Sequence, residues 1–300
     1  MEFTAVSWNL FHGRDFPPDP SLFTWRSRLL RLTERNATHV QVNRELLAEF
    51  AGMLAGAAWD VALLQECPPR FAAPLATACG AEAHRALTSR NSLAPLRALA
   101  AKLNPDLIAS AEGGSNLTLV RHPFRCALST HGGEKAHRKG GVVERREVTV
   151  HSGRPERRAM ALTRIAVDDD GRRRELCVAN LHATNDRPAM AAEDVLRAAE
   201  AASGWAGDAP LLFGGDLNLR PAEDPAVFAE LRERFGLAGA TAPQAIDHLL
   251  SRGLRTVAPA APWPAEKREL THDGLALRLS DHAPIEARFD RADPAAGEQE

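Results

Sequence analysis

Short apolar runs separated by polar turns dominate the hydrophobic pattern, and they predict buried strands. Between them lie longer segments with apolar residues three and four positions apart, which predict helices. The expected strands cover 3–8, 59–66, 113–120, 125–129, 158–167, 172–181, 211–216, 245–250 and 285–289, and the expected helices cover 22–32, 44–54, 69–78, 93–103, 188–205 and 224–235. We expect Asn43 to cap the second helix and residues 259–274 to form a loop.

Polar side chains recur where these strands end. They are Asn9, Glu66, His182, Asp216 with Asn218, and Asp281 with His282, and Asp247 is an acid inside another strand. In sheet-based folds, polar residues at strand ends line a common crevice. Taken singly, Glu66 is equally a solvated strand end and His182 a structural histidine. Their number favours one shared site.

The stretch 211–221 is the most informative of these strand ends. Gly214 and Gly215 allow close approach of backbone or ligand, and alternation places Asp216 and Asn218 on the same side. Pro221 ends the segment. Such an end suits phosphate or metal chemistry, although a simple β-turn has the same composition.

Composition bounds the class of protein. The chain has 300 residues, of which 44% are hydrophobic and 25% charged, and its net charge of −2 excludes a global nucleic-acid-binding signature. Four cysteines without metal-binding spacing are expected to be reduced core thiols. We expect no signal peptide and no membrane span, and therefore a cytoplasmic protein. We also expect it to be a monomer. Tyrosine is absent, so none can act as acid, base or ligand.

Residues 135–158 form the most basic part of the chain. This segment contains eight lysines and arginines but only three glutamates. A solvated surface explains such a run, and so does a hairpin that guides an anionic substrate along its phosphates. The sequence leaves both interpretations open.

Six motifs stand at or near these strand ends. They are Ser7-Trp8-Asn9, Gln65-Glu66, Asn180-Leu181-His182, Gly215-Asp216-Leu217-Asn218, Ile246-Asp247-His248 and Ser280-Asp281-His282-Ala283-Pro284-Ile285. Together they resemble the endonuclease/exonuclease/phosphatase superfamily, which includes nucleases similar to DNase I and exonuclease III. The resemblance implies an α/β fold, a four-layer sandwich of two mixed sheets with helices outside. It implies one catalytic domain over residues 1–289, followed by a polar tail at 290–300, and hydrolysis of a phosphoester with Mg²⁺ or Mn²⁺.

The resemblance also implies a role for each site residue. Glu66 looks like the principal metal carboxylate, and Asn9 and Asp281 look like the other metal ligands. We call these three residues the metal end of the site. Asp216 would orient or deprotonate the attacking water, and Asn218 would help hold the phosphate. Asp247 would pair with one nitrogen of His282, whose other nitrogen faces the phosphoryl oxygen or the water. His182 would stabilise the phosphorane or protonate the leaving oxygen.

Some features depart from the family pattern. Because there is no tyrosine, the chain resembles the branch that uses a histidine at position 182, and Glu112 is the candidate that would support it. The interval 12–58 is longer than in compact members. His122 and His248 are interpreted as structural.

Substrate choice stays open at this point. The leading hypothesis is a phosphodiesterase or nuclease, and the alternative is a phosphomonoesterase or a phospholipid- or inositol-phosphate-type hydrolase. A non-catalytic nucleic-acid-binding module is a third possibility from another class. Loops at 84–112, 131–158 and 259–274 would choose the substrate, and they carry no recognisable motif.

Overall fold

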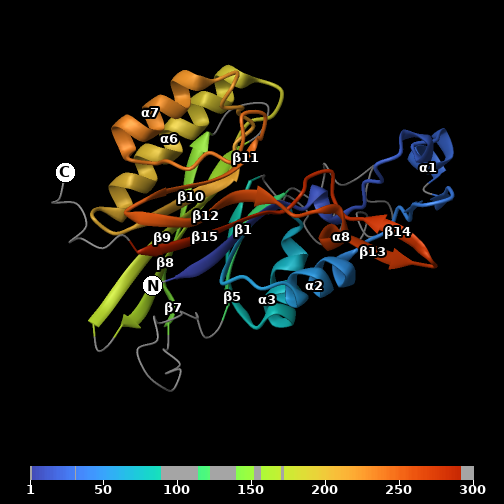
Figure 1. Ribbon diagram of the computed structural model, residues 1–300, viewed down its shortest axis with the longest axis horizontal. Coiled ribbons are helices and arrows are strands. Elements are labelled where there is room, and N and C mark those ends of the chain that lie inside the picture. The colour runs from blue at the N-terminus through green and yellow to red at the C-terminus, as the bar shows by residue number, and fades with distance from the viewer. Residues whose placement is uncertain are drawn as a thin grey trace.

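The computed structural model describes residues 2–30, 32–88, 114–121, 140–151, 157–169 and 172–291, whose strands form two large sheets (Figure 1). The first sheet has the order β12 (Leu254–Pro262), β15 (Ile285–Arg291), β1 (Phe3–Asn9), β4 (Val61–Cys67), β6 (Ser115–Arg121) and β5 (Ala81–Leu87). The second has the order β11 (Asp247–Arg252), β10 (Leu211–Asp216), β9 (Arg172–His182), β8 (Arg158–Asp169) and β7 (Gly140–His151).

Each sheet is mixed, with one parallel pair near its centre. β1 pairs in parallel with β4, and β9 pairs in parallel with β10, whereas the neighbouring pairs are antiparallel. A parallel pair needs a crossover connection. The connections contain α2 (Leu47–Gly56) and α6 (Pro188–Ala206), so each crossover helix covers the sheet that it connects.

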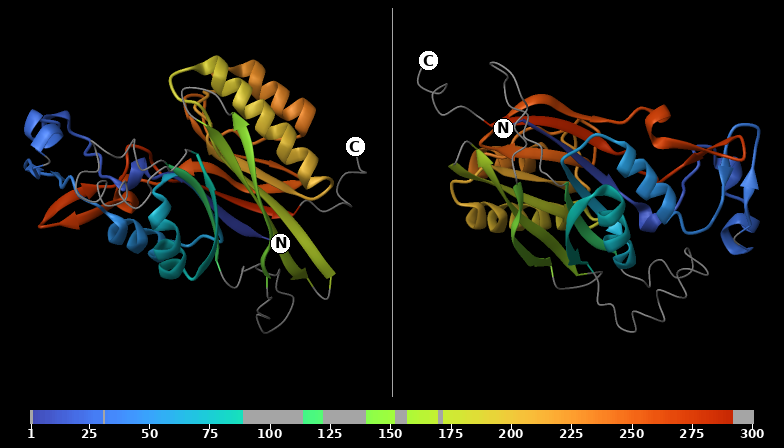
Figure 2. Two further views of the ribbon diagram at one scale, coloured as in Figure 1. Left: turned by 180° about the vertical axis from the view of Figure 1, so that it is seen from behind. Right: turned by 90° about the horizontal axis from the view of Figure 1, so that it is seen from below.

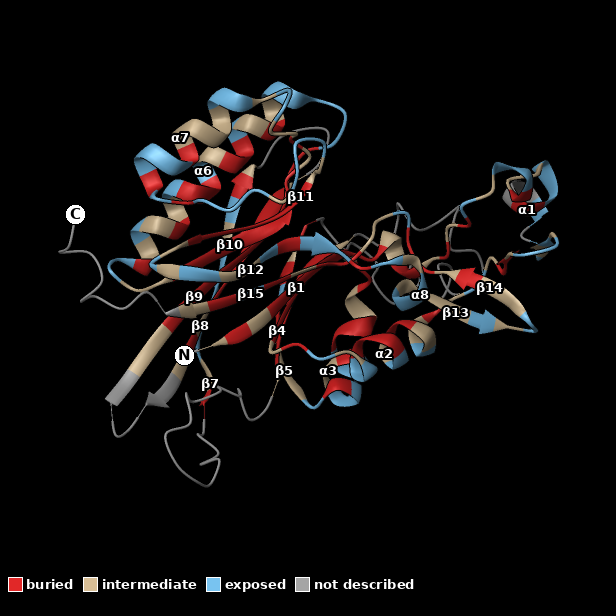
Figure 3. Cartoon of the chain, in the orientation of Figure 1, coloured by how far each residue is buried: buried red, intermediate tan, exposed pale blue. Residues whose placement is uncertain are grey.

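Four layers result, with a hydrophobic core in each of the three gaps. α2 and α3 (Ala72–Cys79) cover the first sheet, and α6 and α7 (Pro225–Phe235) cover the second, as the two views in Figure 2 show from behind and below. The outer faces of these helices are exposed, and the sheets between them are largely buried (Figure 3). The expected four-layer α/β sandwich is therefore confirmed.

A small arm projects beyond the first sheet (Figure 1). The turn η1 (Phe11–Gly13) directly follows β1 and leads into the arm, which consists of η2 (Pro20–Leu22), α1 (Trp25–Leu30), the hairpin of β2 (Glu34–Arg35) and β3 (Val40–Gln41), α8 (Ala265–Arg268), and the hairpin of β13 (Glu269–His272) and β14 (Leu275–Arg278). The bridges Asp15–Leu279 and His39–Ala276 join its two parts. The long interval after Asn9 thus packs against a late segment of the chain.

Three local expectations are wrong. Asn43 does not cap α2, which begins at Leu47 after the N-cap residue Leu46; the Asn43 amide instead donates to Ser27 Oγ and the Leu32 carbonyl. The helix expected over 22–32 is reduced to α1. Residues 259–274 are not a loop, because β12, α8 and β13 occupy most of them.

Other expectations hold or lie outside the described residues. Cys67, Cys79 and Cys177 are buried free thiols, whereas Cys126 and the elements expected at 93–103 and 125–129 lie outside the described ranges. β15 continues through Arg291, so the expected tail begins inside the sheet. None of the described helices combines the length and apolarity that crossing a membrane requires.

Candidate active site

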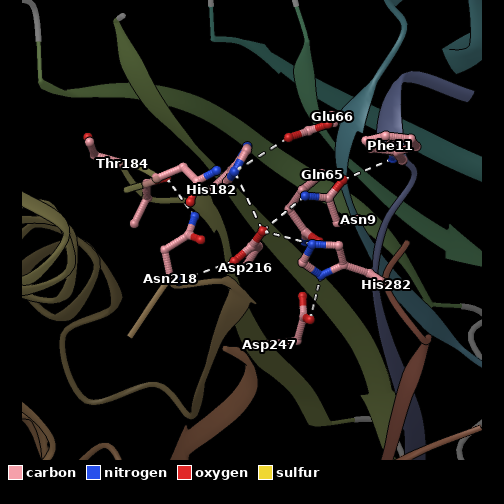
Figure 4. Close-up of polar contacts among 12 residues, drawn as sticks. Asn9, Phe11, Gln65, Glu66, His182, Thr184, Asp216, Asn218, Asp247 and His282 are labelled. Carbon is pink, nitrogen blue, oxygen red and sulfur yellow. Dashed lines mark hydrogen bonds and ion pairs between the residues drawn. The ribbon is translucent and has the colours of Figure 1, made fainter. Parts of the chain in front are cut away.

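The candidate site lies where the core between the two sheets reaches the ends of the strands. In β9, Leu176 and Val178 face this core, and strict alternation continues the same face through Asn180 to His182. Strands β1, β10 and β11 deliver Asn9, Asp216 and Asp247 in the same way. Period-two alternation therefore gathers polar side chains from both sheets (Figure 4).

Glu66 reaches the site only because β4 contains a β-bulge. The register of β4 on β6 shifts between Leu64 and Cys67, and both of these residues face the core under α2 and α3. Alternation alone would turn Glu66 toward the same helices. The bulge and a left-handed φ of +46° turn it away from them. Strained backbone of this kind clusters at functional sites.

The two glycines of β10 allow this strand to lie close to its neighbours. A Cβ atom on Gly215 would lie 1.9 Å from the Leu181 carbonyl oxygen, and one on Gly214 would lie 2.4 Å from the His248 carbonyl oxygen. Gly215 also has a φ of +129°. The glycines therefore serve backbone packing, which places Asp216 beside β9 and β11.

Asp216, Asp247 and His282 form a chain of polar contacts. His282 Nδ1 lies 2.7 Å from Asp247 Oδ2, so the predicted contact between these two residues is present. His282 Nε2 lies 3.7 Å from Asp216 Oδ2. The strand end of β1 fixes the segment that carries His282, because Trp8 Nε1 donates to the His282 carbonyl and Ser280 Oγ donates to the Asn9 carbonyl.

The charges of Asp216, Asp247 and His282 affect the protonation states of Asp216 and His282. Burial acts to lower the pKa of His282, but the hydrogen bond and charge of Asp247 outweigh it and raise this pKa to about 10. Burial and the negative charge of Asp247 raise the pKa of Asp216 to about 7. At neutral pH the imidazole of His282 is therefore a cation beside a carboxylate that readily exchanges a proton.

His182 is buried and neutral. Burial, followed by the positive charge of Arg158, lowers its pKa to about 3. Its Nε2 lies 3.5 Å from Asp216 Oδ2 and 3.8 Å from Glu66 Oε1. A neutral imidazole offers one N–H donor, so His182 can donate a hydrogen bond without carrying charge.

Glu66 and Asp281 are more exposed to solvent than Asp216, whereas Asn9 is buried. Burial acts to raise the pKa of Glu66, but the neighbouring histidines and the Asn9 side chain together outweigh it, so this pKa is lowered. Burial raises the pKa of Asp281, and the charge of Glu66 contributes in the same direction. Two carboxylates that repel each other across a partly exposed site are a suitable pair for a divalent cation.

The donor set of this region fits a hard cation. Asn9 Nδ2 donates to Asp216 Oδ2 at 2.9 Å, and Asn9 Oδ1 accepts from the Phe11 N–H, which leaves a second lone pair on that oxygen. The Glu66 and Asp281 side chains are 21% and 31% exposed, whereas that of Asp247 is 11% exposed. Oxygen ligands with access to water are typical of Mg²⁺.

A second carboxylate cluster is also close enough to consider. Within the described ranges, ligand atoms of Asp216, Asp247 and His282 lie within 4.8 Å of one another. A cation there would meet the positive charge of His282 and would compete with its hydrogen bond to Asp247. The side near Glu66 therefore fits a cation better.

Asn218 lies directly beyond Asp216. Its backbone N–H donates to Asp216 Oδ1, and its side-chain Nδ2 donates to the Ala183 carbonyl. Thr184, the next residue after Ala183, is held by the buried carboxylate of Asp194 through its N–H and its hydroxyl. The eight predicted site residues are thus brought together at one rim of the sandwich.

Sequence reasoning missed several polar residues around the site. His12 Nε2 lies 3.2 Å from Glu66 Oε2, and Asp194 fixes the segment after His182. Gln65 Nε2 donates to Asn180 Oδ1 across the two sheets. Gln65 and Asn180 stand in two of the family motifs without an assigned role, although a buried amide at an inward position of an apolar strand needs a hydrogen-bond partner. No sequence signal indicated His12, since it follows the strand in a turn.

The structure favours the surface interpretation for Arg145 and Arg157 of the basic run, whereas Arg158 is buried and its charge acts on His182. Arg145 pairs with Glu82, and Arg157 pairs with Glu147, both at exposed positions. Residues 122–139 and 152–156, with the remaining basic residues except Arg146 and Arg158, lie outside the described ranges, as do Glu112 and His122. His248 is buried, with Nε2 bonded to the Leu219 carbonyl, which agrees with a structural role.

The sequence profile of the endonuclease/exonuclease/phosphatase family matches residues 6–282, so the fold and site define a member of a family of phosphoesterases. The chain belongs to this family, whose members generally depend on a divalent metal ion. No curated protein sequence matches the chain significantly.

Solved structures support the same fold. An endonuclease/exonuclease/phosphatase family protein from Bacteroides thetaiotaomicron is 13% identical, with a TM-score of 0.61 and coverage of 96% of this chain and 95% of that one. A mannosyl-6-phosphatase from the same species is 13% identical, with a TM-score of 0.58 and coverage of 96% and 99%. The catalytic domain of human Nocturnin is 14% identical, with a TM-score of 0.57 and coverage of 97% and 95%.

Proposed function

We propose that the protein is a divalent-metal-dependent phosphoesterase that hydrolyses phosphodiesters by in-line attack of an activated water molecule. One observation carries this proposal. Asp216 Oδ2 lies between the Nε2 atoms of His182 and His282, at 3.5 Å and 3.7 Å, and accepts a hydrogen bond from Asn9. A carboxylate with a pKa near 7 in this position suits general-base catalysis.

The two histidines would act on the phosphoryl group in different ways. His282, held by Asp247 and positively charged, would contact the phosphoryl oxygen and stabilise the charge that develops there. His182, with its lowered pKa, would donate a hydrogen bond to the phosphorane, a role that this pKa favours over protonation of the leaving oxygen. Asp216 would accept the proton of the attacking water. Asn218 would help to hold the phosphate.

Glu66, Asn9 and Asp281 would hold Mg²⁺ or Mn²⁺. Such an ion supplies Lewis-acid stabilisation of the phosphoryl oxygens and offsets the negative charge of the site. Four carboxylates, Glu66, Asp216, Asp247 and Asp281, surround one protonated imidazole. An anionic substrate would be repelled by this arrangement unless a cation neutralised part of it.

A phosphomonoesterase is the second candidate. A similar structure is named a mannosyl-6-phosphatase, and two arginines of the basic run are ion-paired instead of forming an open phosphate track. The proposed machinery acts on one phosphate, and it therefore serves either ester. A nuclease and an inositol- or lipid-headgroup phosphatase would differ in the loops around it.

The test compares bis(p-nitrophenyl) phosphate with p-nitrophenyl phosphate after treatment with EDTA and addition of Mg²⁺ or Mn²⁺. We expect metal-dependent cleavage of the diester, reduced about 10²–10⁴-fold in Asp216→Asn and His282→Ala. Asp273→Asn, an exposed carboxylate on the arm, is the control that should keep native activity. Preferential cleavage of the monoester would select the second candidate.

DNA, RNA, sphingomyelin and inositol phosphates complete the substrate panel. Cleavage of short DNA or RNA would identify a nuclease, and cleavage of the headgroup or inositol phosphates alone would identify the other branch. Binding of nucleic acid without hydrolysis of any ester in the panel would contradict the proposal and indicate a non-catalytic module.

A further inference from the structure

The turn η1, directly after β1, contacts both residues of the metal end that come from the first sheet. Its first residue, Phe11, donates its backbone N–H to Asn9 Oδ1 at 3.0 Å. Its second residue, His12, places Nε2 3.2 Å from Glu66 Oε2. One short segment therefore orients a carboxamide on β1 and a carboxylate on β4.

The backbone of this turn is held in an uncommon conformation. Phe11 and His12 have φ values of +46° and +54°, which residues other than glycine seldom adopt. Gly13 follows at +77°, and a Cβ atom there would lie 2.6 Å from the Phe71 ring. Arg14 lies over the Phe11 ring and donates Nε to the Phe11 carbonyl. The surrounding contacts thus fix a strained turn next to the site, a situation typical of functional positions.

The two oxygens of Glu66 meet different imidazoles. Oε2 is close to His12, and Oε1 is 3.8 Å from His182. A hydrogen bond to one carboxylate oxygen fixes the orientation of the other, as partners of metal ligands commonly do. The His12 side chain is 23% exposed, whereas that of His182 is 7% exposed.

From this geometry we infer that His12 is a positioning residue of the metal site, which holds Glu66 in the orientation that binds the divalent cation while the Phe11 N–H holds Asn9. The inference rests on the proposed function, because it takes Glu66 as a metal ligand. It adds a residue outside the six motifs that carry the family resemblance. Phe11 contributes through its backbone, so only His12 has a side chain whose removal tests the role.

The experiment measures binding of Mn²⁺ to the purified protein by electron paramagnetic resonance and by calorimetry, without substrate. His12→Gly and His12→Asn remove the imidazole and tolerate a left-handed φ, so both should fold. We expect the dissociation constant for Mn²⁺ to rise about 10–100-fold in both variants. We expect the melting temperature without metal to be unchanged or higher, because the strain at position 12 is reduced. If His12 had only a structural role, its loss would lower the melting temperature together with the affinity for Mn²⁺.

His39→Asn is the matched control. His39 is also a partly buried histidine beside a glutamate, with Nε2 3.8 Å from Glu269 Oε1, but it lies on the arm. We expect His39→Asn to bind Mn²⁺ with native affinity. Glu66→Gln locates the metal and should abolish binding.

Two results would overturn the inference, and they are distinguishable. Native affinity in both His12 variants, with binding lost in Glu66→Gln, would exclude the positioning role and leave the proposed function intact. Native affinity in Glu66→Gln would remove Glu66 from the metal site and would contradict the metal assignment of the proposed function as well. Absence of esterase activity in a protein that binds Mn²⁺ through Glu66 and His12 would contradict only the proposed function.

Discussion

Replacement of Asp216 by Asn should make the protein more stable and inactive. Asp216 is 2% exposed, and the same burial and nearby Asp247 that raise its pKa penalise its ionised form. The unfolded chain does not impose this penalty. An amide at this position would remove the buried charge, and it would also remove the proposed proton acceptor.

The size of the effect follows from the change in pKa. A rise from 3.8 to about 7 corresponds to about 4 kcal/mol of lost stability above pH 7, at 1.36 kcal/mol per tenfold change in the dissociation constant. The amide cannot accept from both Asn9 Nδ2 and the Asn218 N–H, and the loss of one hydrogen bond costs about 1 kcal/mol. We therefore expect Asp216→Asn to be more stable than the native protein by roughly 1–3 kcal/mol at pH 8.

The sign of the pH dependence makes the reasoning testable. The penalty is absent below pH 3.8, grows as pH rises from about 4 to 7, and is constant above 7. Urea unfolding in EDTA at pH 8 and pH 5 should show the advantage of Asp216→Asn shrinking at the lower pH. An advantage that does not change with pH, or a variant less stable than the native protein at pH 8, would refute the account.

Three further substitutions test other parts of the structure. Asp247→Asn should reduce kcat about 10²–10⁴-fold and move the alkaline limb of the pH–rate profile from near pH 10 to lower pH, because the hydrogen bond and charge of Asp247 raise the pKa of His282. An alkaline limb that stays at the native pH would contradict this. Gly215→Ala should lower the free energy of unfolding in urea by about 3 kcal/mol or more, since its Cβ would overlap the Leu181 carbonyl, whereas Gly204→Ala in α6 has open space and should raise it by up to about 1 kcal/mol. Equal effects of the two substitutions would be inconsistent with this packing. Asn180→Leu should lower the free energy of unfolding by about 2–5 kcal/mol, because the Leu64 and Leu117 carbonyls and the Gln65 amide lose their Asn180 partner. A loss below about 1 kcal/mol in the same assay would show that water replaces the Asn180 side chain.

Alternation within single strands accounts for four of the eight predicted site residues, because it delivers Asn9, His182, Asp216 and Asp247 to the same side. His182, Asp216 and Asp247 lie on the inward face that the apolar residues of their own strands define. The family motifs then assigned these positions to one crevice. Neither the strand alternation nor the family motifs depend on the loops. The hydrophobic pattern does not determine how those loops are arranged.

The parts that could not be predicted depend on contacts between distant segments. The bulge that turns Glu66 arises from the register of β4 on β6, which a pattern within β4 does not reveal. Asn43 has the composition of a helix cap, but its amide bonds to Ser27 and Leu32 of the arm. Residues 259–262 extend β12 because β15 offers an edge, although their alanines and prolines suggest a loop.

The pairing of β15 with β1 has a consequence for synthesis and folding. Asn9 emerges from the ribosome early, but the segment that carries Asp281 and His282 is anchored on it by Trp8 and Ser280, and β15 then pairs with the free edge of β1. Until that late segment arrives, β1 has an open edge and the site lacks its imidazolium. The nascent chain should therefore be hydrolytically silent and dependent on protection of that edge, and activity should appear together with the last strand.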